Sequence, residues 1–335
     1  MNRDSNQNEK TPEQIVELLW GARAAQALVA GVELELFTHI AAGKHTAKEI
    51  ARAARAPEPG VARLLDALVG LGYLRKKADK YSLDPGAEKY LVRGSETYLG
   101  DFVYETKMTW PGWGRLGEVV KSGQPVGDEQ MALEFFPMLV KAIFPMSYGA
   151  AHAAIAKLPE KTLKRTQSIL DVAAGSAAWS LPFAQTLPDA RVTALDYPEV
   201  IPVARRYAEQ FGVADRYDYV EGNIRETSFG RDKYDLVILG HIIHGEGAKW
   251  GKKLIKKSYD ALKDGGALLI AEFIPNDSRT GPPIPLLFSL NMLLHSKEGD
   301  VFTMREYKEW LKEAGFKSVK TIDIPAPSPL ILATK

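Results

Sequence analysis

The sequence predicts an α/β fold built on a doubly wound, mainly parallel sheet, preceded by a mostly helical N-terminal domain. The sheet is predicted by short apolar runs that alternate with helical patterns from residue 168 onward. The N-terminal domain is predicted by helical patterns followed by two short strands around a basic turn, which is the order of a winged helix-turn-helix. The charged stretch 161–166 separates the two regions, so we expect the boundary near it.

The N-terminal helices have recognisable starts. Residues 12–40 carry apolar side chains at helical spacing, and Thr11 followed by Pro12 provides an N-cap and a first-turn proline. Thr46 and Glu49 match a capping box, which predicts that another helix begins there. The other elements expected in this half are a helix over 59–70, strands over 72–74 and 80–83, and helices over 96–165.

In the second half, strands and helices alternate. Strands are expected at 168–173, 191–196, 217–220, 234–240, 267–271, 318–323 and 329–334. Helices are expected to end near 187 and 211, and to run over 248–262 and 303–314. Strands separated by helices pair in parallel, and such sheets bind their ligands beyond the carboxyl ends of the strands.

Composition excludes several classes of function. The 335 residues carry a net charge of +1 and no cysteine, which excludes disulfides, thiolate metal sites and a cysteine nucleophile. A net charge this close to zero does not indicate a nucleic-acid partner. No run of apolar residues approaches the ~20 that a membrane span needs. Residues 1–10 are polar and unlike a signal peptide. We therefore expect a cytoplasmic protein without a nucleic-acid or membrane partner.

A small-residue loop follows the first strand of the second half. It runs Asp171-Val-Ala-Ala-Gly-Ser-Ala177, and the next strand ends in Asp196, 25 residues after Asp171. Small side chains let the backbone approach a ligand, and a carboxylate at the end of the next strand can accept hydrogen bonds from both ribose hydroxyls. The plainer interpretation is an ordinary tight turn with a surface aspartate.

The loop composition discriminates between two nucleoside cofactors. A dinucleotide site needs G-x-G-x-x-G so that the pyrophosphate can cross the loop. Here Ala173 and Ala177 occupy the first and last small positions and leave only Gly175. S-adenosylmethionine has no phosphate, so the loop favours it over NAD.

These residues, taken in order, resemble a known family. The motifs are Asp171-x-Ala-x-Gly, Leu195-Asp-Tyr-Pro, Gly222-Asn-Ile, Leu239-Gly-His-Ile-Ile-His244, Gly265-Gly-x-Leu-Leu-Ile-Ala-Glu272, Phe288-Ser-Leu-Asn-Met-Leu-Leu and Thr303-x-x-Glu-Tyr-x-x-Trp. Over residues 12–335 the chain is similar to class I methyltransferases, and more narrowly to small-molecule O-methyltransferases with an N-terminal winged-helix dimerisation domain.

The resemblance implies a Rossmann-like methyltransferase fold, S-adenosylmethionine as cofactor and a homodimer. It implies methyl transfer to a hydroxyl of a small, aromatic or polyketide-like molecule. His244 corresponds to the general base, Glu272 to the residue that positions it, and Asp196 to the ribose-binding acid. Asn223 stands where an Asp commonly faces the adenine amine. The cofactor-binding residues expected on this basis are Asp171, Ala173, Gly175, Asp196, Tyr197, Asn223, Ile224, Gly240 and His241.

The acceptor is expected to contact residues of the helical region and of a late apolar segment. They are Trp110, Phe144, Tyr148, Asn291, Met292 and His295. The domains expected are a disordered lead (1–11), the winged-helix dimerisation domain (12–95), a helical linker with pocket residues (96–165) and the catalytic domain (166–335). The chain departs from the family pattern at Ala173 and Ala177, which replace glycines, and at Val301, where plant members carry a second glutamate.

Several alternatives remain open from the residues alone. Without the resemblance, the pattern favours His241 and His244 as surface imidazoles at a strand end. A metal site is not expected, because the pair lacks further ligands at helical spacing. The chain could bind the cofactor without methylating, could be an NAD oxidoreductase, or could be a winged-helix DNA-binding regulator. Against the last, the helix over 59–68 is mostly apolar, whereas a DNA reader needs polar contacts.

Overall fold

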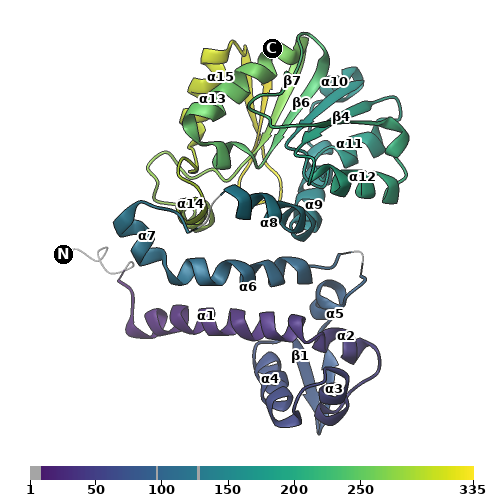
Figure 1. Ribbon diagram of the computed structural model, residues 1–335, viewed down its shortest axis with the longest axis vertical. Coiled ribbons are helices and arrows are strands. Elements are labelled where there is room, and N and C mark those ends of the chain that lie inside the picture. The colour runs from purple at the N-terminus through teal and green to yellow at the C-terminus, as the bar shows by residue number, and fades with distance from the viewer. Residues whose placement is uncertain (1–8, 96, 127–128) are drawn as a thin grey trace, which may run out of the picture. The chain divides into compact units, whose positions relative to one another are not determined.

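The computed structural model describes residues 9–95, 97–126 and 129–335. The described part of the chain forms two compact units, residues 9–110 and 111–335 (Figure 1). Residues 1–8 of the expected disordered lead lie outside the described residues.

The N-terminal unit contains the order that the sequence predicts, three helical segments followed by a hairpin, with the first segment divided into α1 and α2. Helix α1 begins at Thr11, whose side chain accepts from the Gln14 backbone, and Thr46 and Glu49 form the expected capping box. The long helical pattern breaks after α1, where Glu35 adopts a left-handed conformation. The elements are α1 (Pro12–Glu33), α2 (Leu36–Ala41), α3 (Ala47–Ala53), α4 (Glu58–Gly70), β1 (Leu74–Lys77), β2 (Lys80–Leu83) and α5 (Pro85–Leu91), with α6 (Gly100–Gly114) crossing into the second unit.

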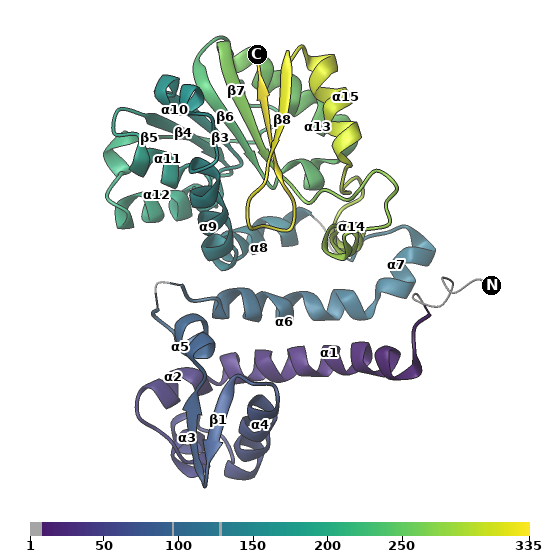
Figure 2. The ribbon, with the colours of Figure 1, turned by 180° about the vertical axis from the view of Figure 1, so that it is seen from behind.

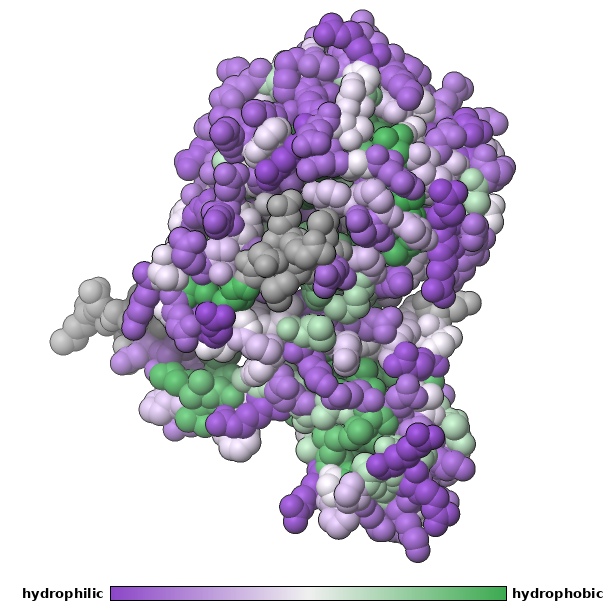
Figure 3. All heavy atoms as spheres, viewed as in Figure 1, coloured by the Kyte–Doolittle hydropathy of each residue, from purple (hydrophilic) through white to green (hydrophobic). Residues whose placement is uncertain are grey.

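Helix α1 exposes a run of large apolar side chains near its N-terminus. Figure 3 shows hydrophobic atoms gathered there, and the residues are Ile15, Val16, Leu18, Leu19 and Trp20. Among the described residues, α1 is long and apolar enough to cross a membrane by length and composition alone, which the sequence analysis did not anticipate. The charged residues Glu17 and Arg23 interrupt its apolar run.

The second unit begins with four helices and continues with alternating strands and helices. The helices are α7 (Leu116–Ser122), α8 (Glu129–Ala142), α9 (Phe144–Ile155), α10 (Glu160–Arg165), α11 (Leu181–Thr186), α12 (Ile201–Gln210), α13 (Ile243–Ala261), α14 (Pro283–His295) and α15 (Met304–Ala314). The strands are β3 (Ser168–Val172), β4 (Arg191–Asp196), β5 (Tyr217–Glu221), β6 (Tyr234–Gly240), β7 (Leu262–Ala271), β8 (Ser318–Ile322) and β9 (Leu330–Thr334).

The seven strands form one sheet in the order β5-β4-β3-β6-β7-β9-β8. The first five strands in this order, β5, β4, β3, β6 and β7, run parallel. Strand β9 pairs antiparallel with both β7 and β8. The chain first winds outward from β3 and then returns to add β6 on the other side of β3. Such a reversal opens a crevice beyond the carboxyl ends of the two strands.

Helices cover both faces of this sheet. Along β6, Leu236 and Ile238 belong to one buried cluster and Val237 and Leu239 to the other, as the period of two in a strand requires. The first cluster includes side chains of α9, α11 and α12, and the second includes side chains of α13 and α15. Figure 2 shows α12 and α15 on opposite sides of the sheet. The expected doubly wound, mainly parallel fold is confirmed.

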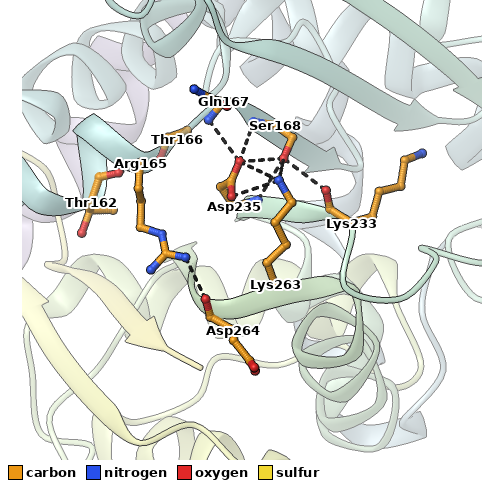
Figure 4. Close-up of polar contacts among 9 residues, drawn as sticks. All are labelled: Thr162, Arg165, Thr166, Gln167, Ser168, Lys233, Asp235, Lys263 and Asp264. Carbon is orange, nitrogen blue, oxygen red and sulfur yellow. Dashed lines mark hydrogen bonds and ion pairs between the residues drawn. The ribbon is translucent and has the colours of Figure 1, made fainter.

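A polar cluster joins the starts of three central strands (Figure 4). The buried Asp235 carboxylate accepts hydrogen bonds from the Ser168 hydroxyl at 2.8 Å and from the Lys263 ammonium at 3.1 Å. It also accepts the backbone N–H groups of Gln167 and Ser168. Burial alone would raise the pKa of Asp235, but these donors outweigh it and lower that pKa. The cluster lies at the strand end opposite the crevice, so it is structural.

One predicted helix is preceded by an additional turn. The helix expected from 248 is present, but α13 begins at Ile243 because a short helical turn precedes it across a kink at Gly247, where φ is 73°. The Glu272 side chain, from the end of β7, accepts the backbone N–H groups of Ile243 and His244 at 2.7 and 3.2 Å. It thereby satisfies donors that a helix start leaves open. His244 consequently lies in the first helical turn rather than at a strand end.

Candidate active site

The small-residue loop after β3 wraps around the Asp196 carboxylate. The backbone N–H of Gly175 donates to Asp196 Oδ2 at 2.7 Å, and the backbone N–H of Tyr197 donates to Oδ1 at 2.7 Å. Burial raises the pKa of Asp196 to about 6, although both N–H donors oppose the rise. The two bonds hold the carboxylate at the mouth of the crevice with lone pairs left for further donors.

Three residues of this loop have a left-handed backbone. The φ angles are 54° at Ala173, 59° at Gly175 and 58° at Ala177. Glycine adopts this conformation freely, whereas an alanine there costs roughly 1–2 kcal/mol. The loop therefore keeps a glycine-type path although two of its glycine positions hold alanine.

Asp171 lies beneath the loop in a buried hydrogen-bond chain. The Ser180 hydroxyl donates to Asp171 Oδ2 at 2.5 Å, and the Tyr217 hydroxyl donates to the Ser180 oxygen at 3.0 Å. Burial raises the pKa of Asp171 to about 7, against the Ser180 bond. Asp171 thus supports the loop from below, and Ser180 and Tyr217 are partners that the motif did not indicate.

The residues expected around the adenine follow β4 and β5. Tyr197 stacks on Phe136 with ring centroids 6.5 Å apart and ring planes within 5° of parallel. Asn223 Oδ1 accepts the backbone N–H of Arg225 at 2.9 Å, so its side chain is oriented by a local turn. Ile224 is buried. The three residues flank the carboxyl ends of neighbouring strands.

His244 and Glu272 form the central polar pair. His244 Nδ1 lies 2.6 Å from Glu272 Oε2, and the Glu272 side chain is buried. Burial alone would raise the pKa of Glu272, but the interactions with His244 and His241 outweigh it and lower that pKa. Glu272 is therefore an anion that orients the His244 ring.

His241 follows Gly240 at the end of β6 and faces the same carboxylate. Its backbone is left-handed, with φ 58°, and its backbone N–H donates to the Ala271 carbonyl at 2.8 Å. Its Nδ1 atom lies 4.0 Å from Glu272 Oε2 and has no hydrogen-bond partner among the described residues. Burial lowers the pKa of His241 to about 4, although Glu272 opposes the effect, so the ring is neutral near pH 7.

Aromatic rings form a wall beside the pair. Phe288 of α14 meets the His244 ring edge-on with centroids 4.8 Å apart, and Phe273 lies 4.1 Å from Phe288. Phe273 also lies 5.0 Å from the ring of His241. The sequence analysis did not include either phenylalanine among the site residues, although Phe273 directly follows Glu272 and Phe288 opens a quoted motif.

The expected acceptor residues on α14 share its last two turns. Met292 is buried, and His295 is exposed, with Nδ1 2.9 Å from the Asn291 carbonyl oxygen. The loop after α14 bonds to the catalytic turn, since the Asp300 backbone N–H donates to the His244 carbonyl at 3.0 Å. Ser289 of α14 donates to the Asp300 carboxylate at 2.5 Å, which links the helix to this loop.

The aromatic residues of α9 that were expected to bind the acceptor pack near α12. Phe144 is buried and stacks on Tyr207 of α12 with centroids 3.9 Å apart. Tyr148 packs on Phe144 and donates from its hydroxyl to Gln185 at 2.8 Å. Both rings are thus engaged in packing between α9 and α12. Trp110 is the last residue of the N-terminal unit.

The sheet order, the buried acid at the end of β4 and the His–Glu pair beyond β6 and β7 define a class of protein. They fit an enzyme that binds a nucleoside cofactor. A family model described as an O-methyltransferase domain matches residues 150–317, and an O-methyltransferase dimerisation domain matches residues 16–93. The chain belongs to the O-methyltransferase family.

Named relatives agree with this assignment. The chain is 29% identical to the tetracenomycin polyketide synthesis 8-O-methyl transferase TcmO of Streptomyces glaucescens, covering 97% of each chain. It is 29% identical to the 3-hydroxy-5-methyl-1-naphthoate 3-O-methyltransferase of Streptomyces sahachiroi, covering 94% of this chain and 92% of that one. A candidate O-methyltransferase from Nostoc punctiforme has a solved structure with a TM-score of 0.86 at 29% identity, covering 98% of this chain and 100% of that one.

The enzyme is accordingly an S-adenosylmethionine-dependent O-methyltransferase that acts on a small molecule. The site fits that cofactor, because the buried Asp196 carboxylate offers acceptors for ribose hydroxyls and the small side chains of the loop let the backbone approach it. The N-terminal match also explains the apolar residues of α1, since a dimerisation domain requires an apolar face. Dimerisation was the function that the sequence analysis preferred there over DNA binding.

Proposed function

We propose that this enzyme methylates a phenolic hydroxyl of a flat, aromatic or polyketide-like molecule, with His244 as the general base. The observation that carries the proposal is the pairing of His244 Nδ1 with Glu272 at 2.6 Å beside the Phe288 ring. It joins a proton acceptor to an apolar wall that suits an aromatic acceptor.

The pairing determines which nitrogen of His244 is free to act. Because Glu272 is an anion, the Nδ1 atom of a neutral His244 carries the proton and donates it to the carboxylate. The lone pair is then on Nε2, which accepts the proton of the acceptor hydroxyl. The positive charge that forms on the ring is stabilised by Glu272. General-base assistance of this kind contributes about 10²–10⁴-fold to a rate.

When bound, S-adenosylmethionine supplies a methyl group already activated on a sulfonium. We propose that Asp196 binds the ribose hydroxyls and that Tyr197, Asn223 and Ile224 surround the adenine. The floor of the cofactor site and the side that faces the methionine part of the cofactor are formed by Asp171, Ala173, Gly175, Gly240 and His241. The remaining task of the chain is to align the acceptor oxygen with the methyl group, and alignment supplies much of such accelerations.

For the acceptor side we propose Phe273 and Phe288 as the wall, together with Asn291, Met292 and His295. Two relatives support an aromatic acceptor, since their names specify a polyketide and a hydroxylated naphthoate. The packing of Phe144 and Tyr148 against α12 leads us to leave them out of this set. Trp110 stays a prediction.

A direct test is methyl transfer to a panel of phenols, naphthols and hydroxylated polyketides. We expect products that are heavier by one methylene and S-adenosylhomocysteine in equal amount, detected by mass spectrometry. The control is a matched set of O-methylated compounds, which offer no free hydroxyl and should give no product. Binding of S-adenosylhomocysteine by calorimetry without any product across the panel would instead favour a family member that has lost methyl transfer.

We also propose that the protein is a homodimer formed through its N-terminal domain. The dimerisation-domain match supports this, as do the exposed apolar residues of α1. We keep the expected division into a lead, a dimerisation domain, a helical linker and a catalytic domain as part of the proposal. A cytoplasmic location is proposed too, because the cofactor is an intracellular metabolite, and cell fractionation tests it.

A further inference from the structure

We propose that His241, His244 and Glu272 form a binding site for one divalent transition-metal ion of the zinc type, and that an ion bound there inactivates the general base. The inactivation rests on the proposed function of His244, whereas metal binding itself does not. The methyl-transfer reaction needs no metal, so the site is inhibitory.

The three residues provide a donor set that zinc prefers. Each offers one ligand atom, and these atoms all lie within 4.8 Å of one another. Two imidazoles and one carboxylate with an open fourth position form a known type of zinc site. With bonds of about 2.1 Å, donors around tetrahedral zinc lie about 3.4 Å apart. His244 Nδ1 is 2.6 Å and His241 Nδ1 4.0 Å from Glu272 Oε2, so both distances are within about 1 Å of that spacing, and the ligand atoms of the two imidazoles lie no more than 4.8 Å apart.

An independent observation points to a ligand at this position. His241 Nδ1 is buried and has no hydrogen-bond partner among the described residues, although it faces a carboxylate. Leaving such an atom unsatisfied destabilises the fold, and each case in a native protein calls for an explanation. A cation between His241 and Glu272 would satisfy both groups.

The local structure holds His241 in this orientation. Its backbone is left-handed, and its backbone N–H is bonded to Ala271. Its ring lies 5.8 Å from the ring of Trp179 and 5.0 Å from that of Phe273. Conformations of this kind are uncommon for residues with side chains and cluster at functional sites. Since the ring is already directed at Glu272, little ordering remains for an ion to impose.

Binding would change the protonation of His244. A metal–nitrogen bond to Nδ1 uses the lone pair of that atom, so the single proton of the neutral ring must move through solvent from Nδ1 to Nε2. The ring remains neutral and now carries its one proton on Nε2. Nε2 then has no lone pair to accept the proton of the substrate hydroxyl, so occupancy by the ion and base catalysis exclude each other.

The test uses the full chain without an affinity tag, first stripped with a chelator and then titrated with Co²⁺. A tetrahedral Co²⁺ site has strong visible absorption, whereas an octahedral one has weak absorption, so the spectrum reports geometry without any activity measurement. We expect one strongly absorbing Co²⁺ per chain, displaced by one Zn²⁺. His241→Asn, which tolerates a left-handed backbone, should weaken Zn²⁺ affinity at least about tenfold.

The matched control is His152→Asn, because His152 is exposed on α9 and lies outside the cluster. We expect its Co²⁺ spectrum and Zn²⁺ affinity to equal those of the unsubstituted protein. Glu272→Gln is a second variant that should lose the strong absorption, and circular dichroism identifies any variant that has not folded. No bound Co²⁺, weak octahedral absorption, or equal affinity in His241→Asn would overturn the proposal.

Activity separates this inference from the proposed function. We expect methyl transfer in the presence of a chelator, and inhibition by Zn²⁺ in proportion to its occupancy. Absence of methyl transfer with the chelator would overturn the proposed function, while the Co²⁺ titration would still decide whether the ion binds. Full activity at full Zn²⁺ occupancy would overturn the inhibitory role.

Discussion

The Nδ1 atom of His244 lies 2.6 Å from Oε2 of Glu272, while Oε1 of the same carboxylate accepts the backbone N–H of His244 at 3.2 Å. One buried side chain from β7 therefore orients both the imidazole and the helical turn that carries it. A substitution at Glu272 should affect rate and folding together, whereas a substitution at His244 should affect rate alone.

Replacing His244 with alanine removes the proton acceptor and leaves the cofactor crevice in place. We expect His244→Ala to lower kcat by about 10²–10⁴-fold, which is the usual contribution of a general base. The affinity for S-adenosylhomocysteine, measured by calorimetry, should stay within about twofold of the unsubstituted value, because base catalysis acts on the rate. Unchanged turnover would remove His244 from the mechanism.

Glu272→Gln keeps a carbonyl oxygen for the backbone N–H groups but loses the charge. If that oxygen caps α13, the amide N–H₂ faces His244 Nδ1 and favours the tautomer with the proton on Nε2, which cannot act as a base. We expect kcat to fall about 10²–10⁴-fold, as for a base held in the wrong tautomer.

Glu272→Asp is the matched control for charge, since it keeps the carboxylate but shortens its reach. We expect both variants to unfold at lower denaturant concentration, by about 1–3 kcal/mol, because buried N–H groups lose good partners. A Glu272→Gln protein with full activity would contradict the proposed tautomer.

Cofactor binding should weaken as the solution is acidified through the pKa of Asp196. Burial raises that pKa from 3.8 to about 6, and ribose hydroxyls donate best to the ionised form. The Kd for S-adenosylhomocysteine should therefore rise below pH 6, approaching about tenfold per pH unit. The effect on folding has the opposite sign, because a raised carboxyl pKa stabilises the fold below pH 4 and loses that contribution as the pH rises to 6.

The control is Asp196→Asn, which should bind more weakly at pH 7.5 and show a flatter profile between pH 5 and 6.5. Calorimetry at each pH provides both curves. If the variant kept the full slope, another group, such as Asp171, would be responsible.

The alanines of the cofactor loop should respond differently to glycine. Ala173→Gly removes the strain of a left-handed alanine, which costs roughly 1–2 kcal/mol. Glycine also makes the unfolded chain more flexible, which offsets about 0.4–1 kcal/mol of that gain in stability. We expect a gain of roughly 0.5–1 kcal/mol in the free energy of unfolding. Ala177 is fully buried, so Ala177→Gly also loses a packed methyl worth about 0.8 kcal/mol and should be near neutral. Denaturant titration of both variants measures the difference, and destabilisation by Ala173→Gly would contradict the argument.

A charge on the exposed face of α1 should separate the proposed dimer. Leu18 is 79% exposed within the chain and lies in the dimerisation-domain match. We expect Leu18→Asp to shift the mass measured by light scattering from two chains toward one, because a buried unpaired charge is costly. Val120→Asp, at an exposed apolar position of α7 outside that match, should leave the mass unchanged. A monomeric unsubstituted protein would contradict the homodimer.

Local patterns predicted most of the fold because its elements have local causes. The capping box of Thr46 and Glu49 starts α3, and the apolar runs around Leu170 and Val237 form buried strands. The turn that precedes Gly247 in α13 was missed because its capping group, Glu272, lies 28 residues away in the sequence. Two glycines at 245 and 247 also obscured the helical pattern.

The site could be predicted only where a motif ties a residue type to the end of a strand or to the turn that follows it. Asp196 and His244 are of this kind. Aromatic residues at helical spacing have the same pattern in a core and in a pocket, so Phe144 was expected to contact the acceptor although it packs against α12. Phe273 and Phe288 become neighbours of the base only through the pairing of β6 with β7 and the placement of α14.

The bond between the Asp300 backbone N–H and the His244 carbonyl affects how the enzyme can diversify. The turn that carries His244 and the segment following α14 are in close contact, since Ser296 also donates to the Gly245 carbonyl and a side chain at Gly247 would strike the Glu298 backbone. Attempts to broaden acceptor scope by changing residues 296–300 would therefore perturb proton transfer at the same time. Changes at Phe273 or Phe288 can reshape the aromatic wall without removing the hydrogen bonds that orient His244. These two positions are therefore the better starting points for engineering.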